Sequence, residues 1–403
     1  MTPVRSYVVF IVLVALPGLF VTLQLTREPA AHTVAVEAEH DPDEGGDRRD
    51  RAASAGSADG GGAATASGSK QADGGRDGSA GGEVAAKPRM KRALRVASVG
   101  WEYLAPGVVA NDGARAGKRS LFDKQRLPVE LKAYKSMEEV EAALARGGED
   151  KLGADVAIVP LPLFVAAHER LRALAPRIFF VAGWSRGHDG LMASARYSLT
   201  RLPRRVALVG RKVQPATYLS LYLLDLAGRR PGRVTLLARG SRRAGRAPFV
   251  AMERPLPRDA KTGDRRFLAT TADAPRLIPI VAIAPQGLIE AHAEALSVWG
   301  NVWTSGIDRL KRDVPRAARR VAALEGAPHV LDLLKRLGQM DPASLMDNAR
   351  VARLSGRSTT TLDQLFRRTW RVWRAAGVLS SPMPAQAPIS VELISSMFRT
   401  YPA

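Results

Sequence analysis

The chain of 403 residues contains no cysteine. This absence excludes disulfide bonds, thiol nucleophiles, thiolate zinc sites and an anchor built on a lipid-modified cysteine. The six histidines show no paired spacing typical of metal ligands, and the sequence has neither a phosphate-binding loop nor a dinucleotide-binding fingerprint. We therefore predict no metal site and no cofactor.

Acidic residues are scarce relative to basic ones. There are 39 Asp and Glu against 60 Lys and Arg, which gives a net charge of +21. Such a balance suits a nucleic-acid partner, but the basic residues are scattered and no RNA- or DNA-binding signature accompanies them. A genome composition that favours arginine codons and a basic surface that steers anions both explain the charge. We predict no nucleic-acid partner.

One long run, residues 7–25, lacks any charged residue. At 1.5 Å per residue, about 19 residues just span a hydrocarbon core of about 30 Å. Arg5 precedes the run and acidic residues follow it, so the positive-inside rule places the rest of the chain outside the cytoplasm. A cleavable signal peptide is the alternative. We favour an uncleaved anchor over residues 1–27, at the periplasmic face of the inner membrane.

Aromatic residues are absent from residue 28 to about residue 90, where Gly, Ala, Ser, Asp and Arg predominate without periodicity. A segment of this composition cannot bury enough apolar surface to fold. We predict a disordered linker over residues 28–91, with a root-mean-square reach of about 40–45 Å for about 60 residues. Residues 92–403 are then the folded part, which we expect to fold alone as a monomer.

Strand-like apolar runs alternate with helix-like segments in the folded part. Residues 94–100 and 154–161 predict strands, and residues 136–148 predict a helix that Ser136 caps and Gly147 ends. The alternation predicts an α/β architecture with mainly parallel sheets. Further strands are predicted over 128–134, 177–184, 190–194, 204–210 and 232–238.

The C-terminal part is predicted to be mostly helical. Its last strongly amphipathic helix, within residues 360–377, places large apolar side chains on one face. We expect this face to pack in the core. Its members are Leu362, Leu365, Phe366, Thr369, Trp370 and Trp373.

The order of these elements resembles the periplasmic substrate-binding proteins of ABC importers, of the nitrate, sulfonate, taurine and thiamine-precursor type. The resemblance implies a type II binding-protein fold: two α/β lobes joined by two crossings, with a small ligand bound between them, and a receptor rather than an enzyme. The crossings are expected near residues 190–205 and 275–290. The segments that carry the resemblance are residues 94–106, 121–167, 198–237 and 268–313.

Ligands of open α/β sheets bind beyond the carboxyl ends of the strands. In the first lobe this rule selects Gly100 and Trp101 after the first strand, and Pro160 after a later one. The alternatives are that Trp101 fills its loop and that Pro160 starts a helix. In the loop of residues 183–190, Trp184 and Arg186 are candidates, because a guanidinium can bind an anion bidentately.

In the second lobe the start of a helix at Pro215 is the candidate cradle. Gln214 offers an amide, and Ala216 and Thr217 offer N–H groups and a hydroxyl for an oxyanion. Thr271 is a further candidate at the end of a strand. Ordinary helix capping is the competing interpretation for these positions.

We expect no catalytic residues. His188 and Asp189 form half of a catalytic dyad, but no serine or cysteine partner is indicated. The favoured function is a membrane-tethered, extracytoplasmic solute-binding protein that passes a small organic anion or zwitterion to an ABC transporter permease. A tethered sensor or envelope-complex component is the alternative, and an enzyme built on the same fold is less favoured.

Overall fold

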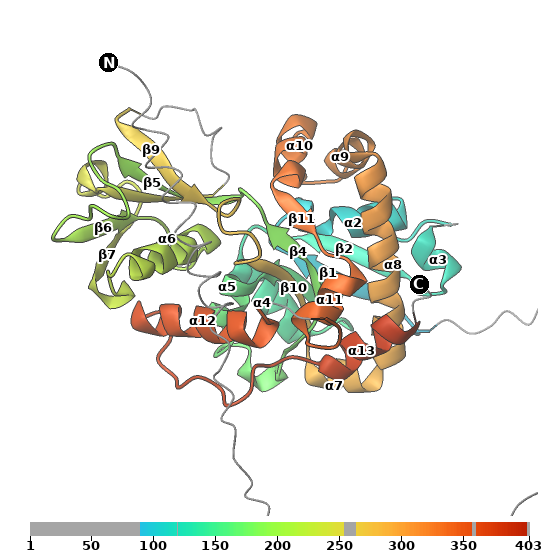
Figure 1. The fold of residues 1–403 in the computed structure, drawn as a ribbon. Coiled ribbons are helices and arrows are strands. Elements are labelled where there is room, and N and C mark those ends of the chain that lie inside the picture. Colours follow the sequence, from blue (N-terminus) through green and yellow to red (C-terminus); the bar gives the residue numbers. More distant parts are fainter. Residues whose placement is uncertain (1–88, 119, 254–262, 357–359, 401–403) are drawn as a thin grey trace, which may run out of the picture. The chain divides into compact units, whose positions relative to one another are not determined.

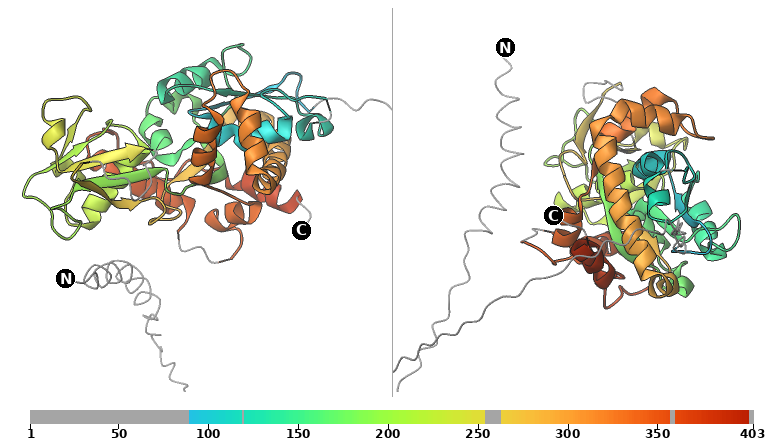
Figure 2. Two further views of the ribbon diagram at one scale, coloured as in Figure 1. Left: turned by 90° about the horizontal axis from the view of Figure 1, so that it is seen from above. Right: turned by 90° about the vertical axis from the view of Figure 1, so that its right-hand side faces the viewer.

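The computed structural model describes residues 89–118, 120–253, 263–356 and 360–400. The predicted anchor and almost all of the predicted linker lie outside these residues. The described residues contain no helix with the length and apolar composition needed to cross a bilayer. They belong to one compact unit, Gly82–Ala403, which is built around two mixed β-sheets (Figures 1 and 2).

Sheet A has six strands in the order β11-β4-β10-β3-β1-β2. Strand β1 pairs in parallel with both β2 and β3, whereas β10 pairs antiparallel with both β3 and β4. Its strands are β1 (Leu94–Ser98), β2 (Val129–Ala133), β3 (Val156–Pro160), β4 (Arg177–Ser185), β10 (Pro279–Ala284) and β11 (Met340–Pro342).

Sheet B repeats this plan with five strands in the order β7-β6-β8-β5-β9. Strand β6 pairs in parallel with β7 and β8, and β5 pairs antiparallel with β8 and β9. The expectation of mainly parallel sheets is wrong around β5 and β10, because each of these strands enters its sheet from the other one. The strands are β5 (Asp189–Ser194), β6 (Val206–Val209), β7 (Val234–Leu237), β8 (Phe249–Glu253) and β9 (Arg265–Thr270).

Helices cover both faces of sheet A. Side chains along β3 alternate between two clusters: Val156 and Ile158 pack with α2 and α8, and Ala157 and Val159 pack with α4 and α5. Near the middle of α8, Gly306 lets the backbone of α2 approach closely, since a Cβ there would collide with the carbonyl oxygen of Pro106. The helices named so far are α2 (Trp101–Asn111), α4 (Met137–Arg146), α5 (Leu161–Ala167) and α8 (Ala293–Arg312).

The remaining helices surround this framework. Helix α6 packs on β5 and β8 of sheet B, and α9 and α10 pack beside α2. These and the others are α3 (Leu121–Lys124), α6 (Pro215–Leu226), α7 (Gln286–Ala291), α9 (Val314–Ala322), α10 (Val330–Gly338), α11 (Leu345–Val351), α12 (Leu362–Ala375), α13 (Val391–Thr400), and the 3-10 turns η1 (Arg172–Leu174), η2 (Pro231–Arg233) and η3 (Ala244–Arg246).

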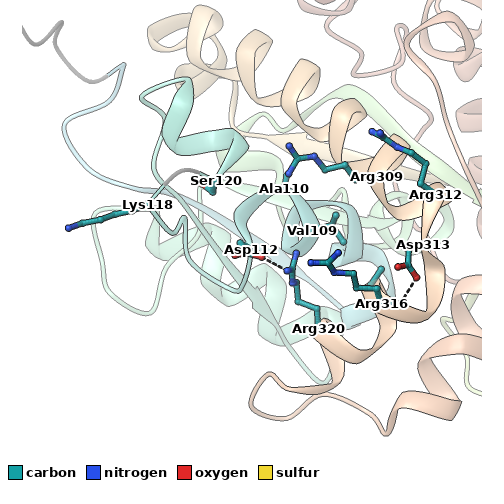
Figure 3. Close-up of a pocket in the computed structure, with 11 residues that line it drawn as sticks. Val109, Ala110, Asp112, Lys118, Ser120, Arg309, Arg312, Asp313, Arg316 and Arg320 are labelled. Carbon is teal, nitrogen blue, oxygen red and sulfur yellow. Dashed lines mark hydrogen bonds and ion pairs between the residues drawn. The ribbon is translucent and has the colours of Figure 1, made fainter. Parts of the chain in front are cut away.

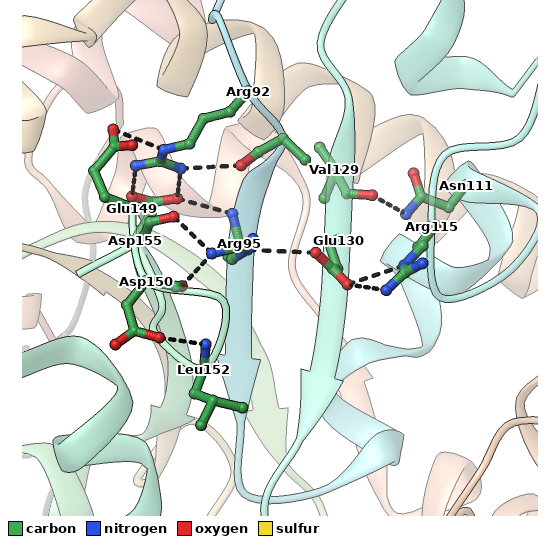
Figure 4. A network of polar contacts seen from close by, with 12 residues as sticks. Arg92, Arg95, Asn111, Arg115, Val129, Glu130, Glu149, Asp150, Leu152 and Asp155 are labelled. Carbon is green, nitrogen blue, oxygen red and sulfur yellow. Dashed lines mark hydrogen bonds and ion pairs between the residues drawn. The ribbon is translucent and has the colours of Figure 1, made fainter. Parts of the chain in front are cut away.

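A polar network fixes the strand ends of sheet A that lie away from the predicted ligand loops (Figure 4). The Asp155 carboxylate accepts hydrogen bonds from the Arg92 guanidinium at 2.7 and 2.8 Å and from the backbone N–H of Arg95 at 2.9 Å. Glu130 on β2 pairs with the guanidinium groups of Arg95 and Arg115. The network therefore links three neighbouring strands through charge-assisted bonds.

Helix α12 contacts both lobes, because it packs on α5 beside sheet A and on α6 beside sheet B. The expected core face of α12 is confirmed, since all six of its predicted residues are buried. Trp373 donates from Nε1 to the carbonyl oxygen of Pro162 at 2.8 Å, and its ring lies 5.9 Å from that of Tyr218 on α6. One continuous set of buried apolar side chains thus runs through both lobes.

We predict that Trp373→Phe lowers the free energy of unfolding by about 1–2 kcal/mol more than Trp370→Phe does. Both indoles are buried on the same helix, but within the described residues Nε1 of Trp370 has no hydrogen-bond partner. Trp370→Phe therefore removes the same ring atoms without breaking such a bond. Urea unfolding of both variants measures the difference, and equal losses would show that the bond to Pro162 contributes nothing.

Candidate functional site

The two connections between the lobes lie side by side. One joins β4 to β5 through residues 186–188, and the other joins β9 to β10 through residues 271–278. The sequence had suggested crossings near 190–205 and 275–290. The first observed connection comes earlier because β4 and β5 are almost continuous.

Thr271 ties the two connections together. Its hydroxyl oxygen accepts from the N–H of Gly187 at 2.7 Å and lies 2.8 Å from Oγ of Ser185, while its own N–H donates to the carbonyl oxygen of Asp189 at 2.8 Å. The side chain is fully buried. The structure therefore gives this predicted ligand donor a role in holding the crossings.

The junction of β1 and α2 carries a carboxylate folded back over the start of the helix. Glu102 is the second residue of α2 and only 1% exposed. A Cβ atom built on Gly100 would lie 2.7 Å from Oε2 of Glu102, so a side chain at residue 100 would require this carboxylate to move. The start of α2 thus has the protein's own carboxylate beside it, in the place where a helix start attracts anions.

Glu102 belongs to a buried cluster of charged groups at the crossings. Its Oε2 lies 3.3 Å from the Arg336 guanidinium of α10, and its Oε1 lies 3.9 Å from Nε2 of His188. On the other side of the imidazole, Nδ1 of His188 lies 3.6 Å from Oδ1 of Asp189. His188 and Asp189 are 5% and 1% exposed. An imidazole and a guanidinium thus lie among two buried carboxylates.

The surrounding acids set the charge of the imidazole. Burial lowers the pKa of His188, but the nearby carboxylates of Asp189, Glu102 and Glu253 raise it more strongly, so the net pKa is above the ordinary value of 6.5. At distances of 3.6 and 3.9 Å these are ion-pair contacts rather than hydrogen bonds. The cluster is closest to neutral when the imidazole is protonated.

The cluster does not have the arrangement of a hydrolytic triad. Ser185 is the hydroxyl nearest to it, and its Oγ donates to Oδ2 of Asp189 at 2.7 Å. Among the described residues, its other side-chain partner is the Thr271 hydroxyl rather than an imidazole. A serine held by a carboxylate has no base beside it to accept its proton, so this geometry provides no activated nucleophile.

The remaining first-lobe candidates lie along the same edge of sheet A. Pro160 is buried at the end of β3 and starts α5. Trp184 is 2% exposed in β4, with the Arg276 guanidinium 5.8 Å from its ring centre. Arg186 is exposed, and its backbone N–H donates to the carbonyl oxygen of Gln339 at 2.8 Å. Among the described residues, its exposed guanidinium forms no ion pair.

The second-lobe candidates lie at the start of α6, after β6. The hydroxyl of Thr217 donates to the carbonyl oxygen of Arg211 at 2.7 Å and so fixes the preceding loop. Gln214 precedes the helix without a side-chain capping bond and is 9% exposed, and Ala216 is fully buried. Two pockets of about 550 and 330 Å³ lie elsewhere, and none of the predicted residues lines either of them.

Sequence reasoning missed two members of the charged cluster. Glu102 stands in an otherwise apolar stretch, Trp101–Val109, and an acid in such a run signals a buried partner. That run also failed to predict α2, because a helix that is buried all round has no apolar stripe and this one contains Pro106. No local signal marks Arg336, which lies 234 residues from Glu102 in the chain.

The described residues contain no set of three or more His, Asp or Glu side chains placed to bind a metal ion.

We predict that His188 stabilises the fold most at low pH. A raised folded-state pKa contributes stability that is fully present below the unfolded value of about 6.5, and that is lost as the pH rises through the folded value. The difference in the free energy of unfolding between the wild type and His188→Gln should therefore shrink from pH 5.5 to pH 8.5. Urea titrations across this range measure it, and a difference that grows with pH would contradict the assignment.

Comparisons with known proteins concern the fold. No model of a protein family matches the chain, and no curated protein matches it. A solved structure described as a putative periplasmic sulfonate-binding protein of an ABC transporter from Methylobacillus flagellatus is 14% identical, with a TM-score of 0.54; the match covers 76% of this chain and 94% of that one.

A second solved structure is described as the ligand-binding component of an ABC-type import system from Staphylococcus aureus. It is 10% identical, with a TM-score of 0.51, and the match covers 76% of this chain and 98% of that one. At such low sequence identities, the structural similarity is evidence for the fold alone. Over its described residues, the chain has the two-lobed α/β fold of periplasmic binding proteins.

Proposed function

We propose that the protein is an extracytoplasmic solute-binding protein of an ABC importer, with its ligand at the crossings and a permease as its partner. The observation that carries the proposal is the exchange of β5 and β10 between the sheets, which brings the crossings and the β1–α2 junction to one buried polar cluster. The solved structures of the same fold are described as binding components of import systems. We propose no catalytic role.

The position of Glu102 limits which class of solute the site can bind. Glu102 already places a carboxylate at the start of α2, which disfavours a simple anion there. Arg186, exposed at the first crossing, can bind an acidic group. We therefore propose a zwitterion, with its cationic group toward Glu102 and its acidic group toward Arg186. Contacts are proposed at Gly100, Trp101, Pro160, Trp184, Gln214, Ala216, Thr217 and Thr271.

A matched pair of solutes tests this proposal. Taurine and ethanesulfonate share the sulfonate, but only taurine carries an amine. We expect taurine or a related zwitterion to raise the thermal midpoint, because ligand at 100 times Kd stabilises the native state by about 2.7 kcal/mol. The same concentration of ethanesulfonate should shift it less.

One variant tests the role of Glu102, and a second variant serves as its control. Glu102→Gln should remove most of the preference for the zwitterion, whereas Glu325→Gln, which changes an exposed glutamate, should leave it unchanged. A shift with ethanesulfonate as large as that with taurine would overturn the zwitterion assignment. No shift with any amino acid, sulfonate, carboxylate, nitrate, phosphate or thiamine precursor would overturn the receptor assignment.

A tethered sensor or envelope-complex component is the second candidate. The feature that favours it is α12, which packs on both lobes and on the core they share. A receptor must separate its lobes to release a solute, and separation would expose these apolar contacts. A scaffold that never opens has no such requirement, so an empty solute screen would favour this candidate.

We further propose that residues 1–27 anchor the protein in the inner membrane and that residues 92–403 lie on its periplasmic side as a monomer. The full chain should then remain in the membrane pellet after alkaline carbonate extraction, with its first residues intact by mass spectrometry. Deletion of residues 1–27 should leave the protein in the cytoplasm. A soluble periplasmic form that begins after residue 25 would instead identify a cleaved signal peptide.

A further inference from the structure

A basic pocket of about 550 Å³ lies between the end of α8, the start of α9 and the last turn of α2 (Figure 3). Five basic and two acidic side chains line it. These are Lys118, Arg309, Arg312, Arg316, Arg320, Asp112 and Asp313. The pocket is at the opposite end of α2 from Glu102, about 15 Å away at 1.5 Å per residue.

The break between α8 and α9 gathers the arginines on one side. Arg309 and Arg312 lie three residues apart in the last turn of α8, and Arg316 and Arg320 lie four residues apart on α9, so each pair shares one face of its own helix. Asp313 separates the helices and caps α9, with Oδ1 accepting from the N–H of Arg316 at 2.9 Å. All four arginines line the pocket, two from each helix (Figure 3).

The two aspartates do not neutralise this cluster. Asp112 pairs with Arg320 at 2.5 Å, and Asp313 is engaged by the backbone of α9. Nε of Arg312 donates to the carbonyl oxygen of Asp308 at 3.3 Å. Within the described residues, Arg309 and Arg316 have no carboxylate within ion-pair distance. Two guanidinium groups thus remain available to a ligand.

We propose that this pocket binds a phosphate-bearing anion. The planar guanidinium group matches the geometry of phosphate and binds it bidentately, so Arg309 and Arg316 can hold one ligand between two helices. Val109, Ala110 and Ala317 give the pocket an apolar floor. A free diphosphate and the headgroup of an anionic phospholipid present the same chemistry. The site is independent of the solute site at the crossings.

The test uses the full chain in a neutral detergent, at low and high salt. Calorimetric titration with inorganic pyrophosphate forms one arm, and monomeric dihexanoyl phosphatidylglycerol forms the other. We expect binding that weakens with salt in at least one arm. Tighter binding of pyrophosphate assigns a free phosphate ligand, and tighter binding of the lipid assigns a headgroup.

Two double variants distinguish binding in this pocket from a general effect of the protein's positive charge. Arg309→Gln/Arg316→Gln should raise Kd at least tenfold, since each charge-assisted bond lost weakens binding. Arg230→Gln/Arg233→Gln removes the same charge from exposed positions around η2 and should change Kd less than threefold. Equal weakening in both double variants, or no binding in either arm, would overturn the proposal. Melting curves of the variants verify that each is folded.

Discussion

Each sheet is completed by a strand that the chain delivers from the other sheet, and the remaining structure depends on this exchange. Strand β10 lies between β3 and β4 in sheet A, and β5 lies between β8 and β9 in sheet B. Neither sheet is continuous without the strand that comes from the other one. The two connections that carry these strands therefore run side by side. Thr271 and Ser185, which contact each other there, are therefore buried structural groups as well as neighbours of the proposed ligand.

Burying charge at the crossings has a cost that the cluster itself offsets. Isolated ions are expensive in a protein interior, but Glu102 and Asp189 face Arg336 and His188 across short distances. The protonation of one imidazole therefore affects both the stability of the fold and the charge that the proposed solute would meet. Removal of one partner leaves the others uncompensated, which is why Glu102 is a sharper probe than the exposed acids.

Helix α12 adds a constraint that a two-lobed receptor has to accommodate. Its aromatic face packs against α5 and α6 together, and Trp373 bonds to the first lobe while contacting Tyr218 of the second. Opening of the lobes must either pivot about this helix or break its contacts. The helix thus limits where a hinge can act, whichever function the protein performs.

Elements whose cause is local could be predicted from the sequence. Ser136 and Gly147 delimit α4, and the spacing of apolar residues marks the buried face of α12, because caps and periodicity are written in neighbouring residues. The order of elements was enough to suggest the two-lobed fold. Only tertiary packing explains the antiparallel insertions, the burial of α2, the presence of strand β8 and the pairing of Glu102 with Arg336. These features depend on contacts between residues far apart in the chain. No local sequence pattern indicates which residue a buried charge pairs with, or which strands an inserted strand lies between.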